Sequence, residues 1–189
     1  FEPDPDAPPR AARVTTPMVI SPPDGRIPFQ PWAAEQRGEI MARQDELAHL
    51  DPRVKCLPSA LPRAHLPVGY NTYQIEQGPG FVLMLYEWNH HSRYIPLDDS
   101  PHIDPAIRLG MGDSRGRWEG NTLVVDTTNF TDRTAFRGSG EALHVVERFT
   151  RVDADTILYE FTVDDPTTWD RSWSVEIPMV KTDGRLYEY

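Results

Sequence analysis

Ionisable side chains gather near the ends of the strands that the sequence predicts. Glu141, His144 and Arg148 form a cluster at the predicted strand Ala142–Arg151, with Glu141 just before it, and Asp126 ends the apolar run Leu123–Val125. A histidine titrates near neutral pH, and a neighbouring carboxylate can orient its ring or exchange a proton with it. We therefore expect His144 to transfer protons, with Glu141 or Asp126 as its partner. Arg148 is expected to bind an anionic group of the substrate.

The segment Phe81 to Tyr94 is predicted as one long strand, and it carries the other candidate residues. Side chains alternate along a strand, so Tyr86, Trp88 and His90 should share one face and Asn89 should lie on the other. The strand is apolar in its first half and polar afterwards, which is typical of a strand that runs from a core into a cleft. His90 is the second candidate for proton transfer. Tyr86, Trp88 and Asn89 are expected to contact the substrate.

A structural role is the alternative for each of these residues. Histidine and arginine can tie strands together through hydrogen bonds on a partly buried sheet, which applies to His144 and Arg148. Asp126 can equally accept a hydrogen bond in the turn that follows its strand.

Several kinds of catalytic site are missing from the sequence. His90 and His91 are neighbours on a predicted strand and point apart, and His144 and Glu147 would lie on opposite faces, so we expect no metal site. No Gly-x-Ser-x-Gly elbow and no glycine-rich phosphate loop is present. We therefore expect an enzyme without a cofactor.

Charge restricts the partners. The formal net charge of the 189-residue chain is -10, and its 19 basic residues are all arginines except Lys55 and Lys181. An acidic chain without a basic stripe repels phosphate backbones and anionic membrane surfaces. No stretch approaches the roughly 20 apolar residues of a membrane helix. We expect a small-molecule ligand or substrate, no nucleic acid and no membrane insertion.

The chain divides into two parts by composition. Residues 1–68 form a proline-rich arm, with one surface helix expected from Trp32 to about His49. Residues 69–189 form an antiparallel β domain, since apolar residues recur there with a period of two. The predicted strands are Asn71–Gln77, Phe81–Tyr94, Arg117–Glu119, Thr122–Thr127, Ala142–Arg151, Thr156–Asp164 and Arg171–Val180. The fold class is mainly β, and we favour a meander closed into a calycin (lipocalin-like) barrel over two paired sheets.

Several motifs occur in an order that resembles one protein family. They are Pro-Pro-Asp-Gly-Arg-Ile-Pro at 22–28, Cys-Leu-Pro at 56–58 with Pro-Arg at 62–63, the run from Met111 to Thr127, Glu141–Val145 and Arg151–Thr156. These segments resemble an uncharacterised family of secreted bacterial proteins, to which no established activity is attached. The resemblance implies an extracytoplasmic (periplasmic or secreted) location. It also implies further segments before Phe1 and after Tyr189, one with a second cysteine to pair with Cys56, or another subunit that completes the barrel.

These observations together predict an extracytoplasmic, cofactor-free acid–base enzyme. Lyase, isomerase and hydrolase chemistry need only proton transfer and charge stabilisation. A small glycan-derived or aromatic molecule is the expected substrate, bound in a pocket of the barrel. The alternatives are a non-catalytic small-molecule binding protein and a structural subunit of a larger assembly. Ionisable groups within hydrogen-bond reach of one another beside a pocket would favour the enzyme.

Overall fold

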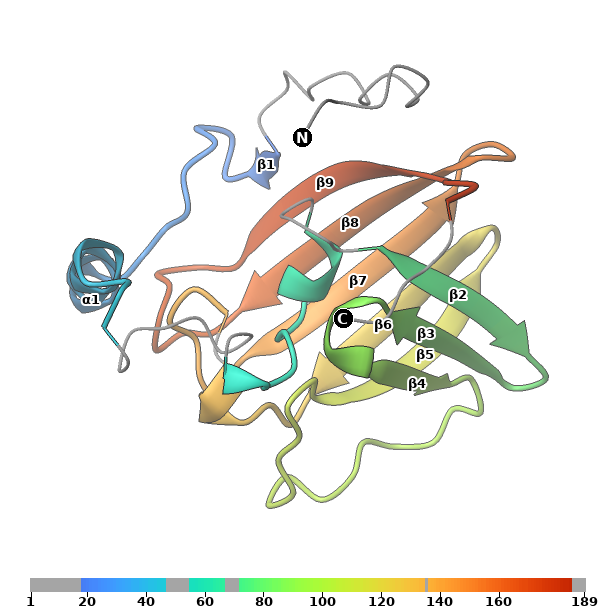
Figure 1. Ribbon diagram of the computed structural model, residues 1–189, viewed down its shortest axis with the longest axis horizontal. Coiled ribbons are helices and arrows are strands. Elements are labelled where there is room, and N and C mark those ends of the chain that lie inside the picture. The colour runs from blue at the N-terminus through green and yellow to red at the C-terminus, as the bar shows by residue number, and fades with distance from the viewer. Residues whose placement is uncertain (1–17, 47–54, 67–71, 135, 185–189) are drawn as a thin grey trace, which may run out of the picture.

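Two antiparallel sheets make up most of the described chain in this computed structural model (Figure 1). The structure describes residues 18–46, 55–66, 72–134 and 136–184. The large sheet has the order β1-β9-β8-β7-β6-β5, and the small sheet has the order β2-β3-β4. The elements are β1 Val19–Ser21, α1 Pro31–Ala42, η3 Arg63–His65, β2 Tyr73–Gly78, β3 Phe81–Tyr86, η4 Trp88–His90, β4 Ser92–Pro96, β5 Asp113–Glu119, β6 Thr122–Thr128, η5 Asp132–Thr134, β7 His144–Arg151, β8 Thr156–Asp164 and β9 Trp173–Val180.

The large sheet follows from the alternation of its residues. In β7, and in β8 from Tyr159 onward, buried and less buried side chains alternate, and β6 to β9 pair with one another in chain order. Between β5 and β6 the turn places Gly120 at a φ of 63°, which favours glycine. The prediction of mainly antiparallel β structure is therefore confirmed.

The core lies between the facing sides of the two sheets. The large sheet supplies Tyr159, Phe161, Val163 and Trp173, and the small sheet supplies Met84 and Ile95, all almost completely buried. Gly116 on β5 permits a close approach, because a Cβ at this position would lie 2.7 Å from side-chain atoms of both Ile95 and Leu97. This approach brings β4 against β5 and so determines which polar residues of the two sheets meet.

The closed barrel is not found in the described part of the chain. The pairing in the small sheet ends at β2 and β4, and the pairing in the large sheet ends at β1 and β5. The coarser prediction, a mainly β fold with one helix, is confirmed. In the described residues no helix is both long enough and apolar enough to cross a membrane.

The predicted long strand Phe81 to Tyr94 is wrong. Asn89 and His90 have φ values of 57° and 54°, so the chain turns through η4 and returns as β4. Residues with positive φ cannot continue a pleated strand. The prediction that one face of a strand carries Tyr86, Trp88 and His90 is therefore wrong, because only Tyr86 belongs to a strand.

The predicted helix is also too long. It begins at Pro31, one residue before the expected start, but ends at Ala42, with a turn in the residues up to Glu46. The remainder of the predicted helix, towards His49, lies outside the described residues. Only Ala33 of α1 is buried, so little packing stabilises a longer helix.

Candidate functional site

Asp126 on β6 lies between two histidines. Its Oδ2 is 2.9 Å from Nε2 of His144, the first residue of β7, and its Oδ1 is 2.9 Å from Nε2 of His102. His102 belongs to the long connection between β4 and β5, so residues far apart in the sequence meet at one carboxylate. The side chain of His144 is 43% exposed and that of Asp126 is 32% exposed. These groups can therefore be reached from solvent.

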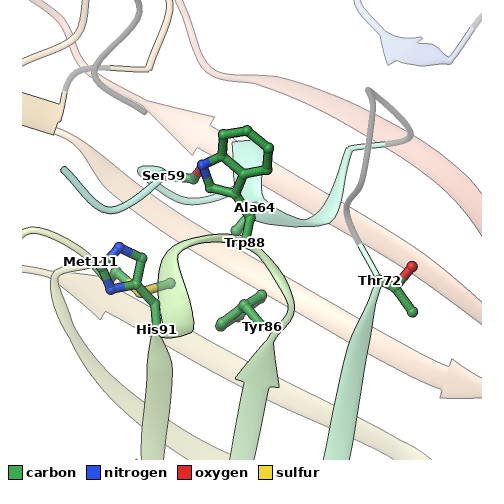
Figure 2. Close-up of a pocket in the computed structure, with 7 residues that line it drawn as sticks. All are labelled: Ser59, Ala64, Thr72, Tyr86, Trp88, His91 and Met111. Carbon is green, nitrogen blue, oxygen red and sulfur yellow. The ribbon is translucent and has the colours of Figure 1, made fainter. Parts of the chain in front are cut away.

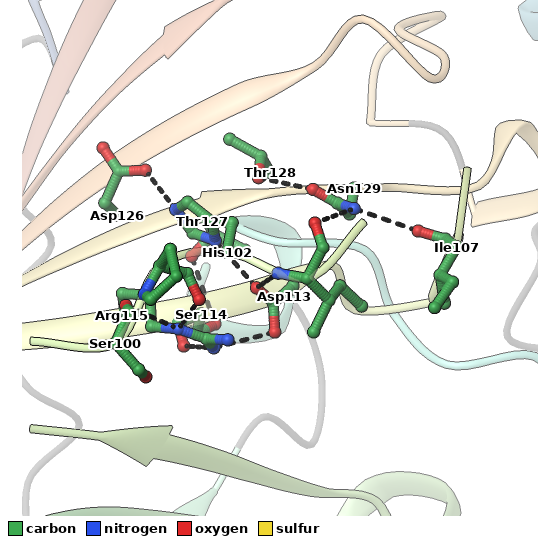
Figure 3. A network of polar contacts seen from close by, with 12 residues as sticks. Ser100, His102, Ile107, Asp113, Ser114, Arg115, Asp126, Thr127, Thr128 and Asn129 are labelled. Atoms are coloured by element: carbon green, nitrogen blue, oxygen red, sulfur yellow. Dashed lines mark hydrogen bonds and ion pairs between the residues drawn. The ribbon is translucent and has the colours of Figure 1, made fainter. Parts of the chain in front are cut away.

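A second carboxylate extends this row inward. Asp113 accepts a hydrogen bond at Oδ2 from Nδ1 of His102, and its Oδ1 is 2.8 Å from Arg115 (Figure 3). Both ring nitrogens of His102 thus face carboxylate oxygens, and both can donate only when the ring is an imidazolium ion. Positive and negative side chains therefore alternate when both histidines are protonated, in the order His144, Asp126, His102, Asp113 and Arg115. We call these five residues the histidine–aspartate row.

Strand register brings the row together. Arg115 lies opposite Asp126 in the β5–β6 pair, and Asp126 lies opposite Val146 in the β6–β7 pair. His144 is two residues from Val146 and therefore shares its face, diagonally next to Asp126. The sequence prediction that His144 and Asp126 could be partners relied on this two-residue repeat.

The connection that carries His102 is held by Asn129 and by a glycine. The side-chain amide of Asn129 donates hydrogen bonds to the carbonyl oxygens of Ile103, Asp104 and Ile107. Gly112 has a φ of 71°, and a Cβ there would lie 2.6 Å from a backbone oxygen, so glycine is required. These contacts fix the backbone on both sides of the row.

Hydrogen bonding shifts the pKa values of His144 and Asp126, the two solvent-accessible residues of the row. The hydrogen bond to Asp126 raises the pKa of His144 above its ordinary value, and partial burial opposes this only in part. The hydrogen bond from His144 lowers the pKa of Asp126, with a further contribution from His102. Because Nε2 of His144 donates to the carboxylate, the lone pair of the neutral ring is at Nδ1. Among the described residues Nδ1 has no hydrogen-bond partner, so it is available to a substrate.

A titration of the imidazole signals by NMR should detect this pairing. We expect the pKa of His144 to lie above 6.5, the ordinary value, and to fall in Asp126→Asn, because the neutral amide stabilises imidazolium less than a carboxylate does. His144→Gln assigns the His144 signals by their loss, and His90→Gln identifies those of His90, which lies on η4 rather than in the row. A pKa for His144 that does not change in Asp126→Asn would contradict the pairing.

A surface pocket of about 160 Å³ reaches this row. Its lining includes Asp126 and Arg115 of the row, together with Arg117, Asp99 and Ser100. The remaining lining residues are Pro96 and Gly116, so none of the described lining residues is aromatic. Side chains of this kind suit a polar ligand with hydroxyl or carboxylate groups.

The opposite face of the large sheet holds a buried polar network. Glu147 on β7 accepts hydrogen bonds from Arg93 of β4, from the hydroxyl of Tyr159 at 2.7 Å, and from Nδ1 of His65 at 3.0 Å. Nε2 of His65 is 2.8 Å from the hydroxyl of Tyr86. The side chains of Glu147 and His65 are completely buried.

This network has one consistent assignment of protons. Burial lowers the pKa of His65, and the hydrogen bond to Glu147 offsets this only partly, so the ring is neutral at pH 7. A neutral ring that donates from Nδ1 to Glu147 must accept at Nε2 from Tyr86. Burial alone would raise the pKa of Glu147, but the charge of Arg93 and the hydrogen bond from His65 outweigh it, and the pKa falls to about 2. Glu147 and Arg93 therefore form a buried ion pair.

The cavity beside this network is small. It is lined by Tyr86, Trp88, His91, Ser59, Ala64, Thr72 and Met111, and its volume is about 10 Å³ (Figure 2). This is room for about one water molecule. The buried network therefore lacks space for a substrate in this structure, whereas the histidine–aspartate row borders an open pocket.

The structure separates the remaining predicted site residues from His144. Glu141 is exposed and lies before β7, where it pairs with Arg108. Arg148 forms an ion pair with Glu119 at 3.0 Å. His90 on η4 is exposed.

The other three residues predicted to contact substrate lie in the small sheet and in η4. Tyr86 is buried in the network around His65. Trp88 and Asn89 are in η4, where the amide of Asn89 donates to the carbonyl oxygen of Leu57. Tyr86 and Trp88 line the small cavity and not the pocket beside Asp126.

Sequence reasoning missed His102, His65 and Arg93. No repeat covers the connection that holds His102, so its position could not be deduced. Glu147 did carry a signal, because a charged residue at a core-facing position between Val145 and Phe149 requires a buried partner. In the described residues no group of three or more histidine, cysteine or acidic side chains is arranged to hold a metal ion.

Comparisons with known proteins add no functional information. A scan of the sequence against models of protein families finds no match, and searches among curated proteins and among solved structures find none either.

Proposed function

We propose that this protein is an acid–base enzyme acting on a small polar molecule, with His144 as the proton-transfer residue and Asp126 as its partner. The observation that carries the proposal is the hydrogen bond from Nε2 of His144 to Asp126, which leaves Nδ1 of a solvent-accessible ring without a described partner. A carboxylate of this kind holds the ring in one tautomer and stabilises the imidazolium ion that forms when Nδ1 accepts a proton.

The proposed reaction moves one proton and needs no cofactor. Nδ1 of neutral His144 removes a proton from a carbon or an oxygen of the substrate. The electron pair left behind expels a leaving group in a lyase, or is reprotonated at a neighbouring carbon in an isomerase. In a hydrolase the proton comes from the attacking water. In each case His144 gives the proton back to product or solvent, so the enzyme is regenerated.

The pocket beside Asp126 favours a glycan-derived substrate over an aromatic one. Its arginines, Arg115 and Arg117, can donate hydrogen bonds to carboxylate or hydroxyl oxygens, and Asp99 and Ser100 can accept them from hydroxyl groups. An aromatic substrate would require ring contacts that the described lining does not provide.

The extracytoplasmic location and the calycin-like barrel belong to this proposal. The resemblance of the motifs at 22–28, 56–63 and 111–127 to a family of secreted bacterial proteins is the support for the location. Two facing antiparallel sheets, whose outer strands have no further strand partner among the described residues, support an incomplete barrel that further chain segments or another subunit would complete.

A turnover screen tests the proposal. Small sugar acids, neutral sugars and simple aromatic acids are incubated with the wild type and with His144→Gln, and loss of substrate is followed by NMR. We expect turnover of at least one sugar acid by the wild type and much less by the variant. Equal turnover by both proteins would show that His144 does not take part in the reaction.

A non-catalytic binding protein is the second candidate. The pocket lining includes Asp126 but not His144, which is the arrangement expected if the row only positions polar groups for a ligand. Binding of a sugar acid can be measured as slower hydrogen exchange of the backbone amides around Asp126. Such binding without turnover of any compound would favour this candidate.

A further inference from the structure

Two arginines lie on segments that pack together at one end of the large sheet, away from the residues of the histidine–aspartate row. Arg37 lies on α1, and Arg137 lies in the connection between β6 and β7. Figure 1 shows α1 and this connection at the same end of the sheet. The helix and the connection pack against each other. A Cβ at Gly138, the residue after Arg137, would lie 3.8 Å from Oε1 of Gln36, the residue before Arg37.

The charges of Arg37 and Arg137 are not neutralised by acidic neighbours in the part of the chain that the structure describes. Neither Arg37 nor Arg137 forms an ion pair with any residue in the described part of the chain. Burial lowers the pKa of Arg137, and the charges of Arg37 and Arg63 lower it further. Like charges that lie close together destabilise a fold. The chain has more acidic than basic residues, yet no described acidic side chain lies between Arg37 and Arg137 to neutralise them. The arrangement is therefore costly unless an anion binds there.

The two guanidinium groups are held in position by aromatic rings. Cζ of Arg37 lies 5.8 Å from the centre of the Phe29 ring, and Cζ of Arg137 lies 5.6 Å from the centre of the Phe136 ring. Stacking fixes the plane of a guanidinium group and leaves its N–H edges available for hydrogen bonds.

The backbone and the buried atoms of Arg137 also indicate a built site. Arg137 has a φ of 53°, an uncommon conformation for a residue with a side chain. Its Nε is buried and has no hydrogen-bond partner in the described part of the chain. A buried donor without a partner destabilises the fold unless a ligand supplies the acceptor.

We propose that Arg37 and Arg137 bind a tetrahedral oxyanion, a phosphate or sulfate group. Such a group presents several strong acceptor oxygens and two negative charges, so it can satisfy two arginines at once. A free inorganic anion and a sugar ester share this chemistry. The site uses none of the residues proposed for acid–base chemistry, and it does not depend on that function.

Thermal unfolding and isothermal titration calorimetry test the site. The wild type, Arg37→Gln and Arg137→Gln are compared in sodium phosphate, sodium sulfate and sodium chloride at equal ionic strength, and with a hexose phosphate and a hexose sulfate. The matched control is Arg43→Gln, which changes an arginine of the same region that is already paired with Glu46. Arg37 lies on a mostly exposed helix, so its variant should fold.

We expect phosphate or sulfate to raise the Tm of the wild type and of Arg43→Gln above the chloride value. The Kd should be weaker by about tenfold or more in Arg37→Gln and Arg137→Gln, as for loss of a charge-assisted hydrogen bond. In chloride, Arg37→Gln should be at least as stable as the wild type, because repulsion is relieved. Tighter binding of either ester identifies an ester as the natural ligand, and tighter binding of the free ion identifies the ion. A wild type that does not distinguish these anions from chloride, or an Arg37→Gln variant that binds as the wild type does, would overturn the site.

Discussion

Glu147→Gln should lower the free energy of unfolding by about 3–5 kcal/mol, which is the usual cost of leaving one partner of a buried ion pair uncompensated. Glu147 accepts hydrogen bonds from Arg93, His65 and Tyr159 in a fully buried position. The amide keeps the shape of the side chain but removes the charge that balances Arg93. Because Arg93 is only 4% exposed, solvent cannot replace that charge.

Urea unfolding measures this loss. The control is Glu176→Gln on β9, which makes the same chemical change in a partly exposed glutamate and should alter stability by less than about 0.5 kcal/mol. Replacing both members of the pair, as Arg93→Met with Glu147→Leu, should cost less than the two single changes added together, because no buried charge remains. A loss in Glu147→Gln as small as in the control would show that the network does not stabilise the fold.

The pH dependence of this loss has a definite sign. The pKa of Glu147 is about 2 in the folded protein and near 4.5 in an ordinary environment. A depressed carboxyl pKa stabilises the fold above the unfolded value, and the stabilisation is lost as the pH falls towards the folded value. The difference between the wild type and Glu147→Gln should therefore narrow below pH 4.5. His65 also makes the wild type less stable as the pH falls below 6.5, because burial lowers the pKa of its ring in the folded state.

His144→Gln should reduce kcat by about 10²–10⁴, the usual contribution of a general base, once a substrate has been found by the screen. The pH profile distinguishes this role from a structural one. A base must be unprotonated, so activity of the wild type should decline as the pH falls through the pKa of His144, which Asp126 holds above 6.5. In Asp126→Asn this decline should move to lower pH, while the rate at its maximum falls, because the ring loses its orienting partner.

His90→Gln provides the comparison for this experiment. His90 lies on η4, exposed and outside the histidine–aspartate row, so we expect its removal to leave turnover close to that of the wild type. The assignment would be wrong if His90→Gln were inactive while His144→Gln retained full activity. A pH profile that is the same in the wild type and Asp126→Asn would leave Asp126 without the proposed role.

The contact between His144 and Asp126 could be anticipated because it depends on a regular repeat. Both residues lie on strands with a period of two, and adjacent strands in an antiparallel sheet bring same-face residues within reach. The prediction about Phe81 to Tyr94 used the same rule and was wrong, because two consecutive positive φ values at Asn89 and His90 interrupt the repeat. Local turn geometry of that kind has no apolar pattern to indicate it.

The amino-acid sequence by itself determined the mainly antiparallel architecture, since alternation of apolar side chains is a local property that decides which face of each strand is buried. Only the tertiary structure decided which polar groups meet across the two sheets. His65 and Arg93 reach Glu147, and His102 reaches Asp126, through contacts between segments far apart in the chain. Such contacts depend on the path of irregular connections and on close approaches such as that at Gly116, which a one-dimensional pattern does not encode.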